Sequence, residues 1–380
     1  MVSTRVCGTL RLGSNPNRHP TMPLAKKILF ASCSGGLGHV RAAEALYFYC
    51  QKYFPEIECS HANLADYAGG LFNLIAVRGY NFAVRHLPKV YGKLYEWGDD
   101  ETIDAKKLNI LIQANSKPFI DFINDYSPDI IIATHFFIPP LIRRAKPNIP
   151  IDLLVTDYYA NSIWENSHVR RYFLPCADTA LHLGKNIKFT ITGMPLHPDF
   201  FEPRAPSSPL LNSLGIANGD KTILMMAGGA GATDIPDAAE KIISGIKNIN
   251  LVVITGKNNK KNYRQMADKQ KKYPQIKIIK FTDKIADLLR HSDLVITKPG
   301  GMIVSECAHL GKPMILINPI PGQEEKNAEF LENNGLGVIF RPGDDWIEII
   351  TKNIDKKITV PPNNANEKIL RMAMNLTDDD

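Results

Sequence analysis

A repeated alternation of short apolar runs with helical patterns most constrains how this chain can fold. In the first half, apolar runs occupy residues 27–31, 129–133, 151–155 and 188–192. In the second half they occupy residues 222–226, 251–254, 276–279, 294–296 and 314–317. Runs of this length between turns and amphipathic stretches predict βαβ units and parallel sheets. We therefore expect an α/β chain built from two doubly wound, Rossmann-like domains.

A proline-rich stretch indicates where the two domains meet. Five prolines lie between Gly193 and Leu210, a density that neither a helix nor a central strand tolerates. We expect residues 1–22 to be a disordered leader or an upstream-start artefact, because they lack periodicity. The expected units are then a first domain at 23–200, a second at 201–345, and a helical tail at 346–380 that could pack back on the first domain.

Composition narrows the functional class. The 380 residues are 44% hydrophobic and 22% charged, which suits a soluble chain of about two domains. No apolar run reaches about 18 residues, and the first twenty lack the apolar core of a secretory signal. Six cysteines without a C-x-x-C pair predict neither a zinc site nor a disulfide framework, and a cytoplasmic location is the simplest. The net charge of +6 is too small to require a nucleic-acid partner.

The loop after the first apolar run carries candidate chemistry. It reads Ser34-Gly35-Gly36-Leu37-Gly38-His39 and opens a helix, so its backbone amides can approach an anion or an oxygen-rich group. Its spacing is not G-x-G-x-x-G, which disfavours a nicotinamide site. His39 can act as a general base, since its pKa lies near neutrality. Alternatively, it only caps the helix or forms a local hydrogen bond.

Three loops of the second half are also candidates. Residues 227–232 form a Gly-rich turn that can hold a diphosphate, although a tight strand-to-helix turn explains it equally well. Residues 297–301 precede a helix with Glu306, which can accept hydrogen bonds from both ribose hydroxyls unless it is merely solvated. Residues 319–325, with Asn327, form a polar cluster that can bind sugar hydroxyls.

These loops, in this order, resemble the two-domain GT-B glycosyltransferases of the monogalactosyldiacylglycerol synthase and processive diacylglycerol glucosyltransferase family. The resemblance covers residues 26 to 340. It rests on six segments: residues 34–39, residues 155–157 with Trp164, residues 192–195, residues 226–231, residues 297–301 with Glu306, and residues 321–324 with Asn327. The related peptidoglycan N-acetylglucosaminyltransferase has a serine and paired glutamines where this chain has Ala230 and Gln323-Glu324, which favours the glycolipid branch.

The resemblance implies an inverting transfer of a hexose from a UDP-sugar to a lipid hydroxyl, without a bound metal ion or cofactor. His39 would be the base, with Asp157 as the other candidate for that role. The implied donor site comprises Gly228, Gly229, Ala230 and Gly231 at the diphosphate, Phe281 and Thr282 near the uracil, Gly300, Gly301 and Glu306 at the ribose side, and Gln323, Glu324 and Asn327 at the sugar. The acceptor side comprises Gly35, Gly36, Gly38 and Trp164.

Residues 71–97 mix aromatic and aliphatic side chains with basic ones. In the family this part of the first domain contacts the bilayer, and Phe82, Arg85, Tyr91 and Trp97 are suited to an anionic membrane surface. The resemblance thus implies peripheral association with the inner face of the membrane. An ordinary core-facing helix pair with a wet basic side is the alternative interpretation.

Two rival functions share this architecture. A UDP-sugar 2-epimerase would need acid–base residues around the second carbon of the sugar and would require no lipid. A non-catalytic nucleotide-sugar-binding or membrane-associated scaffold would keep the fold without the chemistry. The hexose, the acceptor lipid and the choice between His39 and Asp157 as base stay open at this point.

Overall fold

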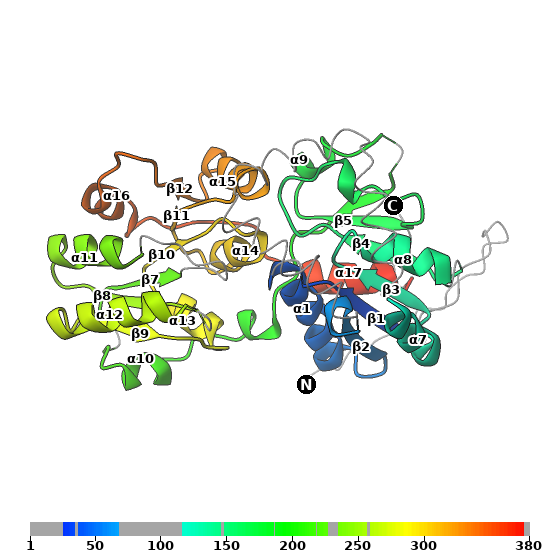
Figure 1. Cartoon of the computed structure of the whole chain (residues 1–380), viewed down its shortest axis with the longest axis horizontal. Helices are drawn as coiled ribbons and strands as arrows, with labels where there is room; N and C mark the ends of the chain where they lie inside the picture. Colours follow the sequence, from blue (N-terminus) through cyan, green and yellow to red (C-terminus); the bar gives the residue numbers. More distant parts are fainter. Residues whose placement is uncertain are drawn as a thin grey trace, which may run out of the picture.

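The structure is a computed structural model that describes residues 26–34, 37–67, 116–145, 148–185, 187–217, 219–226, 235–256 and 259–375. Within these ranges the chain forms two α/β lobes (Figure 1). Several predictions fall on other residues: the leader 1–22, Gly35 and Gly36, the loop 228–231, and the membrane-facing Phe82, Arg85, Tyr91 and Trp97 all lie outside the described residues.

The first sheet has the strand order β2-β1-β3-β4-β5-β6, and all of its pairs are parallel. Its strands are β1 (Lys27–Ser32), β2 (Glu58–Asn63), β3 (Ile130–Ala133), β4 (Ile151–Leu154), β5 (Arg171–Leu174) and β6 (Phe189–Ile191). The accompanying helices are α1 (Leu37–Tyr53), α2 (Leu64–Tyr67), α7 (Lys117–Tyr126), α8 (Ile138–Ala145) and α9 (Ala177–Ala180), with a 3₁₀ turn η2 (Ser162–Trp164).

The second sheet has the strand order β12-β11-β10-β7-β8-β9 and is also parallel. Its strands are β7 (Thr222–Met226), β8 (Asn250–Ile254), β9 (Ile276–Ile279), β10 (Leu294–Thr297), β11 (Met314–Leu316) and β12 (Val338–Ile339). The helices of this part are α10 (Pro209–Ser213), α11 (Ile235–Gly245), α12 (Lys260–Lys272), α13 (Ile285–His291), α14 (Gly301–His309), α15 (Gln323–Asn333) and α16 (Trp346–Asn353), preceded by a 3₁₀ turn η3 (Pro198–Phe200).

The central strands of each sheet are buried on both faces, which explains why they are nearly continuous apolar runs. In β1, Leu29 belongs to the core on one face of the sheet, while Ile28 and Phe30 belong to the core on the other. In β7, Leu224 and Ile223 divide in the same way. The two parallel sheets confirm the expected α/β class.

The last two helices go to different lobes. α16 packs beside α11 on the second sheet, and its Ile350 is buried in that core. α17 (Ala365–Ala373) crosses back and buries Ile369 and Leu370 against the core beside α1, as Figure 1 shows. None of the described helices is long and apolar enough to cross a membrane.

Candidate functional site

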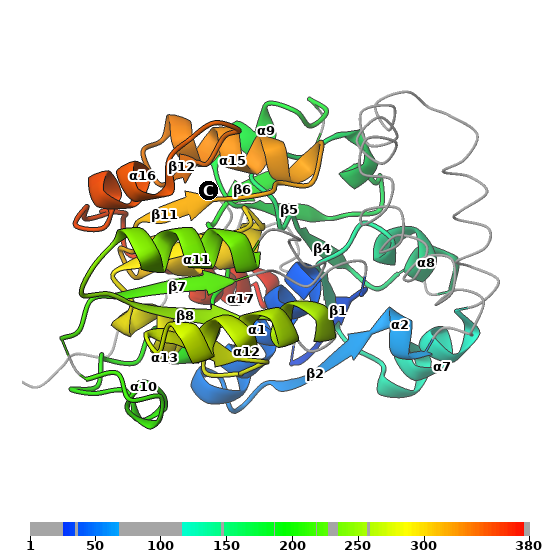
Figure 2. The same ribbon diagram turned by 60° about the vertical axis from the view of Figure 1, so that its left-hand side comes forward.

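Between the lobes, which Figure 2 shows from a second side, the described parts of the loops after β1 and β10 meet, with Gly38 facing Met302. α1, which follows β1, contacts α14, which follows β10. At Gly301 the lobes approach so closely that an added Cβ would lie 2.0 Å from the carbonyl oxygen of Thr156. A residue with a Cβ would clash at this position, so the contact between the lobes requires the glycine at the end of the Thr297-Lys298-Pro299-Gly300-Gly301 loop.

His39 lies in the first turn of α1, with its ring orientation fixed by the loops after β3 and β4. Its Nδ1 is 2.8 Å from the carbonyl oxygen of Thr134 and 2.9 Å from Oγ1 of Thr156. A carbonyl oxygen only accepts, so Nδ1 carries the proton and Nε2 is left as the acceptor. Burial lowers the pKa of His39 to about 4, partly offset by the bond to Thr134. The ring is therefore neutral at physiological pH, with Nε2 able to accept a proton.

Aromatic rings surround His39. Trp164 is buried, and its ring centroid lies 5.9 Å from that of His39. His135, from the loop after β3, makes an edge contact with His39 at 4.4 Å. Burial, and then the nearby His39, hold the pKa of His135 well below its ordinary value. The sequence analysis missed His135, although its place directly after an apolar strand was a usable signal.

Asp157 follows β4 and is buried, but side chains of α15 occupy both of its carboxylate oxygens. Nδ2 of Asn327 donates to Oδ1 at 3.1 Å, and Nε2 of Gln323 donates to Oδ2. Burial raises the pKa of Asp157 to about 6, while the bonds from Asn327 and Gln323 oppose the rise. In this arrangement Asp157 joins the two lobes and has less freedom than His39 to meet an acceptor hydroxyl.

Asn327 is fully buried, and its side-chain amide has partners on both sides. Besides its bond to Asp157, Nδ2 donates to the carbonyl of Pro299 at 3.1 Å, and Oδ1 accepts from the backbone N–H of Tyr158 at 2.9 Å. The predicted sugar contact of Asn327 would thus replace bonds that hold the lobes together here. Tyr158 strengthens the same junction, because its hydroxyl is 2.7 Å from Oγ of Ser305 and its ring stacks on Phe330.

Glu306 lies in α14 and is only 1% exposed. Its Oε1 accepts from Nη2 of Arg41, on α1, at 2.5 Å, whereas its buried Oε2 has no hydrogen-bond partner among the residues that the structure describes. Burial raises the pKa of Glu306, and the charge of Arg41 opposes that rise. A buried, unsatisfied carboxylate oxygen is costly, so this atom has the character expected of a ligand contact. Arg41 was not identified from the sequence, which gives no sign that α1 would meet α14.

The other predicted donor residues occupy less enclosed positions. Glu324 accepts from the backbone N–H of Ile320 at 2.8 Å, with Nζ of Lys298 at 3.9 Å. Phe281 is 54% exposed in the loop after β9, and the neighbouring Thr282 accepts from the backbone N–H of Lys284. Gly300 caps α14, and Gly38 faces Met302 across the junction. These residues all follow the carboxyl ends of strands.

Comparisons with known proteins follow the same two-part division. Residues 39–195 match the family model described as monogalactosyldiacylglycerol (MGDG) synthase, and residues 222–375 match the glycosyltransferase family 28 C-terminal domain. The processive diacylglycerol beta-glucosyltransferase of Bacillus subtilis (strain 168) is 28% identical over 360 residues, which cover 92% of this chain and 92% of the relative. Its namesake from Bacillus pumilus (strain SAFR-032) is 28% identical over 358 residues, with 91% of each chain covered.

Solved structures agree on the fold. Acinetobacter baumannii MurG is similar at a TM-score of 0.55 and 14% identity, covering 92% of this chain and 99% of its own. The UDP-GlcNAc 2-epimerase from Neisseria meningitidis bound to UDP-GlcNAc is similar at a TM-score of 0.59 and 14% identity, covering 92% of this chain and 100% of its own. At these identities the likeness concerns the fold alone, and it confirms the expected GT-B architecture.

Proposed function

We propose that this chain, as a member of the glycosyltransferase family of the monogalactosyldiacylglycerol synthases and processive diacylglycerol glucosyltransferases, transfers a hexose from a UDP-sugar to a hydroxyl of diacylglycerol. The proposed transfer inverts the anomeric carbon and uses neither a metal ion nor a resident cofactor. The observation that carries the proposal is that α1, which holds the neutral His39, meets α14, which holds the buried Glu306, with Arg41 of α1 paired to that carboxylate.

In the proposed reaction, the acceptor hydroxyl oxygen attacks the anomeric carbon as the bond from that carbon to the diphosphate breaks. The hydroxyl proton passes to Nε2 of His39, which is the ring nitrogen left without a proton. UDP leaves with the bonding electron pair, and backbone amides of residues 228–231 and the start of α14 are suited to its negative charge. A single displacement of this kind inverts the configuration.

The donor's ribose is assigned to Glu306 in this proposal. A ribose hydroxyl would donate to the unpartnered Oε2, which would replace a costly buried atom by a charge-assisted hydrogen bond. The arrangement of Arg41 against Oε1 leaves Oε2 as the position for the hydroxyl. Opening of the lobes must precede this contact, because Glu306 is closed off from solvent.

The lipid acceptor places the proposed reaction at a membrane surface. Residues 71–97, which contain Phe82, Arg85, Tyr91 and Trp97, are the proposed contact with anionic lipid at the inner face of the membrane. Added salt is expected to weaken this contact and anionic lipid to strengthen it, since the basic side chains act through screened charge.

The decisive experiment uses purified protein and liposomes of diacylglycerol with anionic phospholipid. UDP-glucose, UDP-galactose and UDP-N-acetylglucosamine are supplied separately, with and without EDTA, and UDP release and lipid products are followed by mass spectrometry. We expect a hexosyl-lipid from one donor at an equal rate with EDTA. An isomerised sugar nucleotide without lipid product would favour the epimerase instead, and binding without turnover would favour a scaffold.

A further inference from the structure

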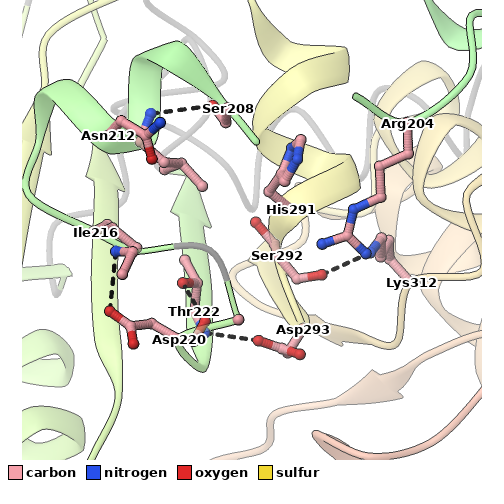
Figure 3. A pocket seen from close by; sticks show the side chains of 13 residues that line it. Arg204, Ser208, Asn212, Ile216, Asp220, Thr222, His291, Ser292, Asp293 and Lys312 are labelled. Carbon is pink, nitrogen blue, oxygen red and sulfur yellow. Dashed lines mark hydrogen bonds between the residues drawn. The ribbon is translucent and has the colours of Figure 1, made fainter. Parts of the chain in front are cut away.

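A cavity lies at the amino edge of the second sheet, on the side opposite the candidate site. Its walls come from the chain just before β7, β10 and β11, from α10, and from the linker between the lobes (Figure 3). The cavity volume is about 80 Å³ and the cavity opens to solvent. Because an ordered water needs only about 10 to 15 Å³ of such volume, a small polyatomic group fits.

Two cations meet in this cavity. Arg204 comes from the proline-flanked linker, and Figure 3 shows its guanidinium turned toward Lys312, which precedes β11. Nζ of Lys312 donates to the carbonyl oxygens of Arg290 at 2.9 Å and Ser292 at 2.7 Å. An ammonium group has three protons, so one stays available. Within the described ranges, neither cation has a carboxylate at ion-pair distance.

The two carboxylates that line the cavity are already engaged elsewhere. Oδ2 of Asp293 accepts from the backbone N–H of Thr222 at 2.8 Å, and its Oδ1 is 3.5 Å from Nζ of Lys221. Oδ2 of Asp220 accepts from the backbone N–H of Ala217 at 3.1 Å. Asp293 therefore offsets part of the charge of Lys312 from a distance, while the guanidinium of Arg204 has no carboxylate at ion-pair distance within the described ranges.

The pKa of Lys312 reflects its burial and its charged neighbours in the cavity. Burial lowers the pKa of Lys312 and the charge of Arg204 lowers it further, while the charge of Asp293 opposes the fall. Two like charges held together at a partly buried site are unfavourable, and an anion between them removes the repulsion. The Arg guanidinium offers a planar donor fork that matches two phosphate oxygens, while Lys acts as a point charge.

We propose that Arg204 and Lys312 form a binding site for a phosphate group, distinct from the nucleotide-sugar site. A bound phosphate would bridge the linker to the loop between α14 and β11, and so would hold the linker against the second lobe. Side chains of the second lobe already hold the neighbouring linker, because the guanidinium of Arg290 donates to the carbonyl of Asp199 and Nε2 of His309 lies 3.1 Å from the carbonyl oxygen of Phe200.

The test is titration of the full chain with inorganic phosphate, followed by calorimetry and thermal unfolding at constant ionic strength. Saturating UDP is present throughout, so that phosphate does not report on the donor site. Arg204→Gln replaces an exposed cationic side chain by a neutral one, so the variant protein is expected to fold normally. Arg264→Gln, on the exposed face of α12, removes the same charge outside the cavity and is the matched control.

We expect wild-type protein and Arg264→Gln to bind phosphate alike, with binding at least about tenfold weaker in Arg204→Gln and partly restored in Arg204→Lys. Equal phosphate binding by Arg204→Gln and wild type would overturn the proposal. A second arm identifies the source of the phosphate group with phosphatidylcholine vesicles that contain phosphatidic acid. Vesicle binding that falls in Arg204→Gln would indicate a lipid headgroup, and unchanged vesicle binding beside lost phosphate binding would indicate a soluble phosphate.

Discussion

At the scale of single residues, the pKa values of His39 and Asp157 separate the two candidates for the base. A base acts only when unprotonated, so its rate contribution is lost as the pH falls below its pKa. The pKa of His39 is lowered to about 4, whereas that of Asp157 is raised to about 6. Each candidate therefore predicts a different acid limb for turnover.

With His39 as the proposed base, we expect kcat to stay level from about pH 8 to about pH 5. The measurement is kcat with saturating donor and acceptor across this range. A fall centred near pH 6 would instead identify Asp157.

His39→Gln should lower kcat by roughly 100-fold or more while donor affinity is retained. Loss of donor affinity instead would make His39 a binding residue.

Arg41 is predicted to act on the donor through Glu306. With Arg41→Ala, the buried carboxylate loses the cation paired to it and takes up a proton more readily, which weakens its bond to a ribose hydroxyl. A charge-assisted hydrogen bond contributes about 1.5 to 3 kcal/mol. We therefore expect donor KM to rise roughly 10- to 100-fold, with a smaller change in kcat.

Matched variants make this test specific. Arg41→Lys keeps the charge and should recover part of the donor affinity, while Lys352→Ala removes an exposed cation on α16 and should leave KM unchanged. Glu306→Ala should raise KM at least as much as Arg41→Ala, and the double variant should be no worse than Glu306→Ala alone. Additive effects of the two substitutions would show that Arg41 does not act through Glu306.

Which residues were predictable from sequence depended on where their partners come from. His39 and Glu306 each follow a Gly-rich loop, so strand order alone placed them at carboxyl edges. Arg41 and Tyr158 lie on helix and loop surfaces whose importance comes from the opposite lobe. No periodicity within one lobe encodes how two lobes face one another, and those residues were accordingly missed.

At the scale of elements, α14 joins the lobes through its first residue. The Cβ of an alanine at position 301 would lie 2.0 Å from the rigid backbone carbonyl of Thr156, so one lobe must move. Overpacking of this kind costs about 1 to 3 kcal/mol. Gly301→Ala should lower the thermal unfolding midpoint and reduce turnover by at least roughly tenfold.

Gly300→Ala is the structural control for this prediction. Its added Cβ would be 3.9 Å from the side chain of Ile303, an ordinary contact, and Gly300 has a φ of −73° that any residue adopts. We expect its unfolding midpoint and its radius of gyration in solution scattering to match the wild type. Equal midpoints for Gly301→Ala and the wild type would show that the lobes are not held at this contact in solution.

Most of the strands recovered from sequence are apolar and buried. β1, β3 and β7 to β11 are apolar, and each overlaps a predicted run. The prediction omitted β2, β5 and β12. The sequence of β2, Glu-Cys-Ser-His-Ala-Asn, is largely polar and only partly buried. It forms a strand because β1 supplies a full parallel register from Lys27 with Glu58 to Ser32 with Asn63.

At the scale of the whole molecule, the chain crosses between the lobes twice, through the proline-rich linker and again before α17. The return crossing fixes α17 on the first lobe, with Asn366 as its main polar contact. Oδ1 of Asn366 accepts from the backbone N–H of Leu196 at 2.9 Å, and its Nδ2 donates to the carbonyls of Leu196 at 3.0 Å and Ala45 at 3.3 Å. One buried side chain thereby ties together the start of the linker, α1 and the C-terminal helix.

Asn366→Ala should destabilise the folded chain by about 2 to 4 kcal/mol, because it leaves the buried backbone groups of Leu196 without partners. The free energy of unfolding is measured by urea denaturation, with the thermal midpoint as a second readout. Glu367→Ala, which removes only an exposed ion pair with Arg371 on the same helix, should change it by less than about 0.5 kcal/mol. Equal free energies of unfolding for the two variants would show that α17 is an accessory to the fold. A lower free energy of unfolding for Asn366→Ala alone would show that the second crossing holds the two lobes in one cooperative unit.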